Sequence, residues 1–199
     1  MNTPMEELLR LVEEKGLIRA RDLADRGIPR QYLSVACGRG LLERLDRGLY
    51  ALSGGVQTEH RSLVEVCALS PHGVICLLSA LQFHGMTTQS PFEVWLAIGT
   101  SKETPRISLV RLRIARFSEA SLKTGVEVHR VNGAELRVFS PAKTVADCFK
   151  YRNKIGVDVA AEALRDFLRQ RRGPMDELIQ HARVCRVERV MRPYLEALL

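Results

Sequence analysis

The stretch that decides the fold of the N-terminal region is Leu17–Leu52, which reads LIRARDLADRGIPRQYLSVACGRGLLERLDRGLYAL. Five glycine and proline residues divide it into segments that are too short for an ordinary globular core: Gly27, Pro29, Gly38, Gly40 and Gly48. The apolar spacing predicts two short helices, one ending at Gly27 and one over residues 30–40. After Gly40 the period changes to that of strands, and a left-handed Gly48 closes a hairpin.

A further helix precedes this stretch. Thr3 is a suitable N-cap, Pro4 suits the first helical turn, and Glu6 completes a capping box, while Gly16 ends the helix. Three short helices followed by a two-stranded hairpin form the winged helix-turn-helix, in which the third helix enters the major groove of DNA and the hairpin, or wing, lies on the backbone. We therefore predict a winged-helix DNA-binding domain over residues 1–55.

Several polar side chains of the third helix and the wing face away from the predicted core. We expect these residues to contact DNA: Arg30, Gln31, Ser34, Arg39, Arg44 and Arg47. Arg30, Gln31 and Ser34 lie on the first turns of the third helix, where such helices touch base edges. Residues 1–55 carry nine basic and eight acidic side chains, so charge alone does not decide between DNA binding and docking of another protein. The placement of the arginines on the third helix and the wing favours DNA.

The composition is that of a folded protein with room for a second domain. The chain has 199 residues, of which 46% are hydrophobic and 27% charged, which suffices for a real core and suggests two domains. Its net charge is +7, and 24 of its 30 basic residues are arginines, the side chain best suited to forked contacts with phosphate or guanine. A polyanionic partner fits this balance.

Cysteine usage and the N-terminus bear on location and cofactors. Five cysteines lie far apart with no CxxC pair, so we expect reduced, mostly buried thiols and neither disulfides nor a zinc site. The N-terminus lacks the basic and apolar regions of a secretory signal, and no apolar run approaches the roughly 18 residues of a membrane span. We expect a cytoplasmic protein with no cofactor, no metal ion and no membrane partner.

The remainder of the chain, residues 56–199, is predicted to be a second domain that follows a small polar connector at residues 53–60. Apolar spacing predicts six helices, over residues 58–70, 74–85, 140–151, 156–172, 174–184 and 186–198. Alternation predicts strands over residues 92–98 and 107–117 and a hairpin that turns at Asn132-Gly133. The expected fold class is α/β (α+β), with a largely antiparallel sheet and a helical C-terminus.

Three segments of the chain resemble the AbiEi-type antitoxins of bacterial type IV toxin-antitoxin systems. They are residues 19–52 of the winged helix, residues 75–85 (ICLLSALQFHG) and residues 139–168 (FSPAKTVADCFKYRNKIGVDVAAEALRDFL), of which the last is the most specific. The resemblance implies a winged helix that represses the antitoxin's own operon by binding a double-stranded DNA operator of inverted repeats. It also implies a C-terminal domain that counters a nucleotidyltransferase toxin encoded next to it, without a stable complex between the two proteins.

The predicted reading helix carries fewer positive charges than this resemblance implies. Arg30 is its only basic residue before Arg39. Residues 102–130 hold seven basic residues against three acids, so the C-terminal domain offers a second candidate surface for nucleic acid.

Charged residues of the second domain are the candidates for antitoxin function: Arg111, Arg113, Lys143, Asp147 and Lys150. Lys143, Asp147 and Lys150 recur at helical spacing, so Asp147 is able to pair with either lysine on one helix face. That face is either functional or a solvated surface of ion pairs. In both cases we expect it to be exposed.

Two other functions fit parts of the sequence. A nuclease would need acids clustered with a lysine around a divalent cation, and the nearest candidates, Glu93, Glu127 and Lys143, lack a recognisable motif spacing. The other is a winged-helix transcriptional regulator without a toxin partner, whose second domain binds a ligand or a protein. We predict a DNA-binding antitoxin and autorepressor without enzymatic activity.

Overall fold

The structure is a computed structural model that describes residues 3–55 and 59–198. The chain forms two compact units. The first is made of Met1–Pro71, Pro105–Arg111 and His129–Leu136, and the second of His72–Thr104, Leu112–Val128 and Arg137–Leu199. The predicted division at residue 55 stays a prediction, and residues 56–58 of the predicted connector lie outside the described residues.

Helix α1, Pro4–Lys15, begins where its capping residues predict. The Thr3 hydroxyl accepts a hydrogen bond from the Glu6 backbone N–H at 3.3 Å, and the Glu6 carboxylate accepts one from the Thr3 N–H at 2.9 Å. Such a cap stabilises a helix by about 1 kcal/mol, because it satisfies donors that the first turn leaves without a partner. Gly16, with φ 67°, ends the helix as predicted.

The second predicted helix is shorter than expected, because its first residues form a strand. β1, Leu17–Arg19, pairs antiparallel with β3, Leu49–Leu52, and only Ala20–Arg26 is helical, as the 3-10 helix η1. Leu17 and Ile18 are both buried. A strand of three residues is too short to show a two-residue period, so its apolar residues read like the start of the following helix.

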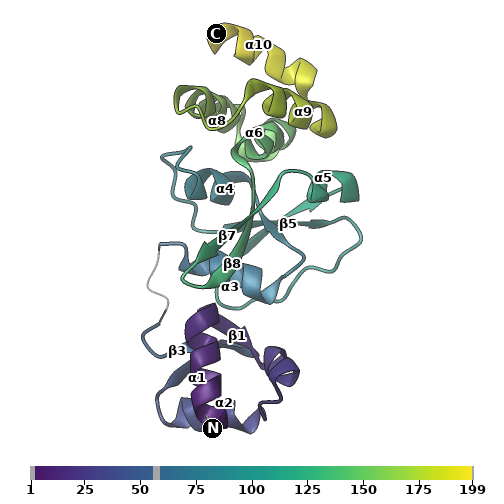
Figure 1. Ribbon diagram of the computed structural model, residues 1–199. Coiled ribbons are helices and arrows are strands. Elements are labelled where there is room, and N and C mark those ends of the chain that lie inside the picture. The colour runs from purple at the N-terminus through teal and green to yellow at the C-terminus, as the bar shows by residue number, and fades with distance from the viewer. Residues whose placement is uncertain (1–2, 56–58, 199) are drawn as a thin grey trace. The chain divides into compact units, whose positions relative to one another are not determined.

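The remaining elements of the winged helix follow the prediction. Helix α2 spans Gln31–Gly38, and strands β2, Leu42–Asp46, and β3 form the wing. The sheet order is β1-β3-β2, and Gly48 closes the wing with φ 77°. Helices α1 and α2 accompany this sheet at the N-terminal end of the chain (Figure 1). Their common apolar core is formed by Leu8, Leu11, Val12, Ile18, Leu23, Ile28, Leu33, Ala36 and Leu42.

A five-stranded sheet of order β6-β5-β4-β8-β7 follows. Its strands are β4 (Val74–Ile75), β5 (Val94–Gly99), β6 (Leu112–Phe117), β7 (Val126–Val131) and β8 (Ala134–Phe139). The α/β class is confirmed, and the pairing is more mixed than predicted, because β5 runs parallel to β6 and β4 runs parallel to β8. All six residues of β5 are buried, as is usual for parallel strands covered on both faces. The predicted hairpin at Asn132-Gly133 is confirmed, with φ of 48° and 83° at its two turn residues.

Short helices lie between these strands. α3 (Arg61–Leu69) precedes β4, α4 (Leu77–Phe83) follows β4, and α5 (Glu119–Lys123) follows β6. The helix predicted over residues 74–85 therefore begins only at Leu77, since Val74 and Ile75 pair with β5.

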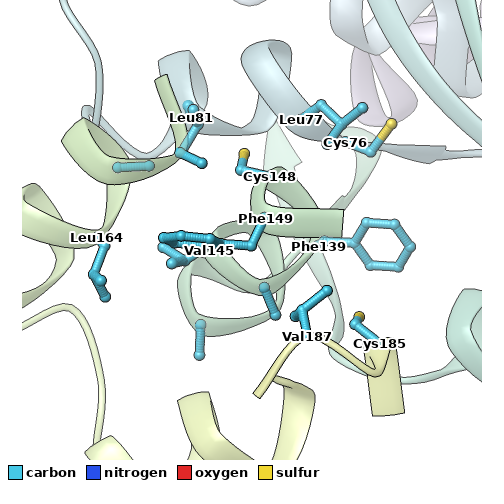
Figure 2. Packing of buried hydrophobic residues seen from close by; sticks show 14 of the residues in the cluster. Cys76, Leu77, Leu81, Phe139, Val145, Cys148, Phe149, Leu164, Cys185 and Val187 are labelled. Carbon is cyan, nitrogen blue, oxygen red and sulfur yellow. The ribbon is translucent and has the colours of Figure 1, made fainter. Parts of the chain in front are cut away.

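Helices make up the rest of the chain, in agreement with the prediction. They are α6 (Pro141–Lys150), α7 (Arg152–Ile155), α8 (Val157–Arg169), α9 (Met175–Cys185) and α10 (Glu188–Leu198). Helix α6 packs against α4, α8 and α9 (Figure 1). Every residue from Ala142 to Phe149 is buried, so this part of α6 has no solvent-exposed face. Figure 2 shows Val145, Cys148 and Phe149 of α6 among the apolar side chains of its neighbours.

The cysteines behave as the sequence predicts. All five are free thiols, of which Cys37 is partly exposed and the other four are buried. Burial raises the pKa of the Cys148 thiol well above its ordinary value. A neutral thiol in an apolar core serves as a small hydrophobic side chain.

Candidate nucleic-acid interface

Helix α2 has one buried and one exposed face. Leu33 and Ala36 lie in the core, with exposed fractions of 2% and 0%. Successive residues are about 100° apart around a helix, so the residues between these positions turn away from the core. Arg30, Gln31 and Ser34 are exposed, as predicted.

The centre of this exposed face is uncharged and small. It consists of Gln31, Ser34, Val35 and Gly38, all exposed. Val35 has an exposed fraction of 40%, and a Cβ atom placed on Gly38 would meet nothing within 4 Å. Val35 is absent from the residues that the sequence predicts to contact DNA, although its position four residues after Gln31 puts both on one face.

Positive charge flanks the uncharged centre. Arg30 precedes the first turn of α2 and Arg39 follows the last turn, and both are exposed. The face therefore offers cationic groups at its two ends and neutral groups between them. Cations suit phosphates, and neutral polar or apolar groups suit base edges.

The wing carries two exposed arginines, Arg44 and Arg47, around a fixed turn. Between them the Asp46 carboxylate accepts hydrogen bonds from the Arg47 backbone N–H at 2.6 Å and from the Ser108 N–H and hydroxyl at 3.2 Å. These bonds, that of Arg47 first, lower the pKa of Asp46 below its ordinary value. The contact with Ser108 joins residues far apart along the chain, and no sequence signal predicts it.

Both acids of the wing are engaged by neighbouring groups. Glu43 lies 3.5 Å from the guanidinium of Arg61 on α3, and Asp46 is held as described above. Arg44 donates a hydrogen bond from Nε to the Asp46 carbonyl at 3.3 Å, which keeps its guanidinium beside the turn. The exposed charge of the wing is therefore mainly positive.

Comparison with known families gives this region its class. Residues 6–53 match a family model described as transcriptional regulator, AbiEi antitoxin. The match runs from α1 through the wing, and over these residues it confirms the resemblance that the sequence indicates. For residues 75–85 and 139–168 the resemblance stays a prediction.

One solved structure extends the comparison to the fold. It is the crystal structure of the RV2827C protein from Mycobacterium tuberculosis, with a TM-score of 0.50 and 13% sequence identity over 91% of this chain and 74% of that chain. At this identity the similarity shows the fold alone. No curated protein sequence matches the chain.

The residues predicted for antitoxin function do not form one exposed group. Arg111, Arg113 and Lys150 are exposed. Arg113 pairs with Glu93 at 3.3 Å, and its guanidinium carbon lies 5.2 Å from the centre of the Trp95 ring. Lys143 and Asp147, by contrast, have no exposed surface.

The prediction of an exposed face for Lys143 and Asp147 is therefore wrong. Their side chains pair within α6, with Lys143 Nζ 2.5 Å from Asp147 Oδ1. The i,i+4 spacing lets the two charges neutralise each other inside one helix, so the helix tolerates burial on all sides. Side chains with no exposed surface do not contact a partner protein directly, and the candidates at the surface are Arg111, Arg113 and Lys150.

The surroundings of this ion pair are apolar and closely packed. Lys143 Nζ lies 4.2 Å from the centre of the Phe139 ring and 4.9 Å from that of Phe117. The Cys185 thiol donates a hydrogen bond to Asp147 Oδ1 at 3.1 Å. Burial raises the pKa of Asp147, and the positive charge of Lys143 opposes that shift.

A second set of polar contacts joins α6 to α9. Ser140 caps α6, because its hydroxyl oxygen accepts a hydrogen bond from the Lys143 backbone N–H at 3.3 Å. The same hydroxyl donates to Glu177 of α9 at 3.2 Å, and Glu177 lies 3.4 Å from His181 Nε2. Burial lowers the pKa of His181, against the opposing effect of Glu177. These contacts fix the two helices against each other.

The residues considered for nuclease chemistry are separated by their partners. Glu93 pairs with Arg113 and Lys143 pairs with Asp147. Within residues 3–55 and 59–198, no three His, Cys, Asp or Glu side chains are grouped so that they would hold a metal ion. The absence of enzymatic activity stays a prediction.

A helix that spans a bilayer needs about 20 mostly apolar residues. In the described part of the chain, no helix is both long and apolar enough to do so.

We predict that the buried ion pair is sensitive to loss of one partner. Asp147→Ala should lower the free energy of unfolding by about 3–5 kcal/mol, because it leaves the Lys143 charge buried and unpaired. The double variant Lys143→Met/Asp147→Leu should lose much less, because it leaves no charge in the core. Denaturant unfolding of the full chain measures both.

Lys150→Met is the matched control for this prediction, since Lys150 lies on the same helix but is exposed. It should change the free energy of unfolding by no more than about 0.5 kcal/mol. Equal losses in the single and double variants would show that packing, and not charge pairing, determines the effect.

Proposed function

We propose that this protein is a DNA-binding antitoxin that represses its own toxin-antitoxin operon and counters a nucleotidyltransferase toxin encoded beside it. One observation carries the DNA-binding part of the proposal. An exposed reading face on α2 lies within residues that match a family described as transcriptional regulator, AbiEi antitoxin.

The reading face supports contact with base edges in the major groove. Arg30 stands at the N-terminal end of α2, the end that reaches bases in helix-turn-helix proteins. Its guanidinium suits O6 and N7 of guanine, and the amide of Gln31 suits N6 and N7 of adenine. Ser34 adds a hydroxyl that both donates and accepts.

The wing and the C-terminal end of α2 support contact with the DNA backbone. Arg39, Arg44 and Arg47 are exposed cations, and cations on phosphates give affinity with little sequence information. We expect an operator of inverted repeats, which requires two copies of the chain related by a two-fold axis.

The antitoxin part of the proposal rests on the family description and on exposed charge in the C-terminal part of the chain. Arg111, Arg113 and Lys150 are exposed there, and no demand of core packing explains Arg111 or Lys150. We assign the function that counters the toxin to this charge, and we expect it to act without a stable complex with the toxin.

Removing the Arg30 side chain tests the reading of DNA. Arg30→Ala should weaken binding to the operator by about 1–3 kcal/mol and relax selectivity at one base position, because the variant no longer binds one guanine. Binding of the full chain to duplexes that carry each base at each position measures this. Arg165→Ala, an exposed arginine on α8, is the control and should change nothing.

An equal loss of affinity for operator and random DNA would contradict a base-reading role for Arg30. If the full chain selects no sequence from a randomised duplex library, the proposed regulatory function itself fails.

The salt dependence of binding tests the wing. Arg44→Ala/Arg47→Ala should flatten the slope of log affinity against log salt by about 0.9 for each phosphate that the wing no longer neutralises. Arg44→Lys/Arg47→Lys retains both charges and should retain the slope. A slope that stays the same in the alanine variant would show that the wing does not touch the backbone.

Two full-length variants test the division of labour between repression and antitoxicity. Arg30→Ala should lose repression of a reporter and still rescue growth when the neighbouring toxin is expressed from a separate promoter. Arg111→Glu/Arg113→Glu should retain repression and lose rescue. Exposed ion pairs contribute only about 0–1 kcal/mol to stability, so this variant should stay folded.

Arg165→Glu is the matched control for charge reversal and should retain both activities. Rescue by the Arg111→Glu/Arg113→Glu variant would contradict the antitoxin role of these two residues. A neighbouring gene whose product is not toxic would instead favour the alternative, a regulator without a toxin partner.

A further inference from the structure

An exposed valine stands in the reading face of α2. Val35 has an exposed fraction of 40%, and Val184 on α9 has a similar one, 38%. Single exposed apolar residues are common on proteins and need no function. The difference between these two valines lies in their neighbours, because Val35 is set among groups that suit a base pair.

The neighbours of Val35 form a shallow, uncharged surface. Gln31 lies one turn before it on the same side of the helix, and Gly38 lies about one turn after it. A Cβ atom at Gly38 would have nothing within 4 Å, so no side chain keeps a DNA groove away from this part of α2. The two arginines stand at the ends of the face and not beside Val35.

This combination matches the major-groove edge of an A·T pair. Adenine presents N7 and N6 there, which a glutamine amide binds through two hydrogen bonds, and thymine presents O4 and its 5-methyl group, which apolar side chains contact. Residues four apart are separated by about 6 Å along a helix axis, and base pairs are about 3.4 Å apart. Gln31 and Val35 therefore reach the same pair or neighbouring pairs.

We propose that Val35 contacts the 5-methyl group of a thymine in the operator, beside the base that Gln31 reads, so that the recognised site contains A·T pairs at its centre. This inference rests on the proposed DNA-binding function and specifies which bases that function selects. It also accounts for the low charge of the reading helix, since methyl and amide contacts select sequence without a cation.

Deoxyuridine provides the test, because it lacks only the 5-methyl group of thymidine. Sequences selected by the full chain from a randomised duplex library supply the probe, and each thymine is replaced singly. For the wild type, one replacement in each half-site should weaken binding about fourfold, the effect expected for one buried methyl group. Val35→Ala should bind the thymine duplex about fourfold more weakly and should no longer distinguish thymine from deoxyuridine at that position.

Two further variants separate this contact from changes in folding. Val35→Thr keeps the branched shape and one methyl group, and it should retain part of the discrimination. Val184→Ala removes an equally exposed valine and should bind both duplexes like the wild type.

Three outcomes would overturn the inference. Sequence-selective binding that is indifferent to deoxyuridine at every position would overturn it while leaving the proposed function intact. Sensitivity to deoxyuridine that persists unchanged in Val35→Ala would assign the methyl contact to another residue. Failure of the wild type to select any sequence would remove the proposed function and this inference together.

Discussion

The ion pair between Lys143 and Asp147 is the constraint around which the C-terminal helices are arranged. Both side chains have no exposed surface, and a charge in an apolar core is tolerated only when a partner and further hydrogen bonds satisfy it. The pair meets this condition within one helix, with Cys185 and two aromatic rings completing its surroundings. Because the charges cancel locally, α4, α8 and α9 are able to pack around α6.

The same pair separates structural from functional residues in the segment over residues 139–168. Ser140 caps α6, and the Thr144 hydroxyl donates to the Phe139 carbonyl at 3.1 Å. Together with Asp147, these polar residues are engaged inside the protein, so they specify how the helix is placed. A surface that acts on a toxin must therefore consist of other residues, and the exposed arginines and Lys150 are the ones at hand.

Local signals in the sequence were sufficient for the winged helix, whereas long-range contacts were not predictable. Thr3 and Glu6, Gly48 and Asn132-Gly133 each dictate a turn or cap through their own backbone preferences, and the structure contains each of these features. Strand β1, the parallel pairing of β5 with β6, and the Asp46–Ser108 contact depend on residues distant along the chain. The burial of α6 was missed for a related reason, since Lys and Asp at i,i+4 look identical on a solvated face and in a core.

The reading helix shows how affinity and selectivity are divided between residues in the proposed complex. Its exposed centre is neutral, and the cations are placed at Arg30, Arg39 and on the wing. Cations attract DNA of any sequence, so a reading face crowded with them would raise affinity for all sites alike. With the charge moved to the margins, each base contact is a short-range one that only the correct pair satisfies. Such an arrangement lowers the total affinity and raises the ratio between specific and non-specific binding, which is the quantity that a repressor of one operator requires.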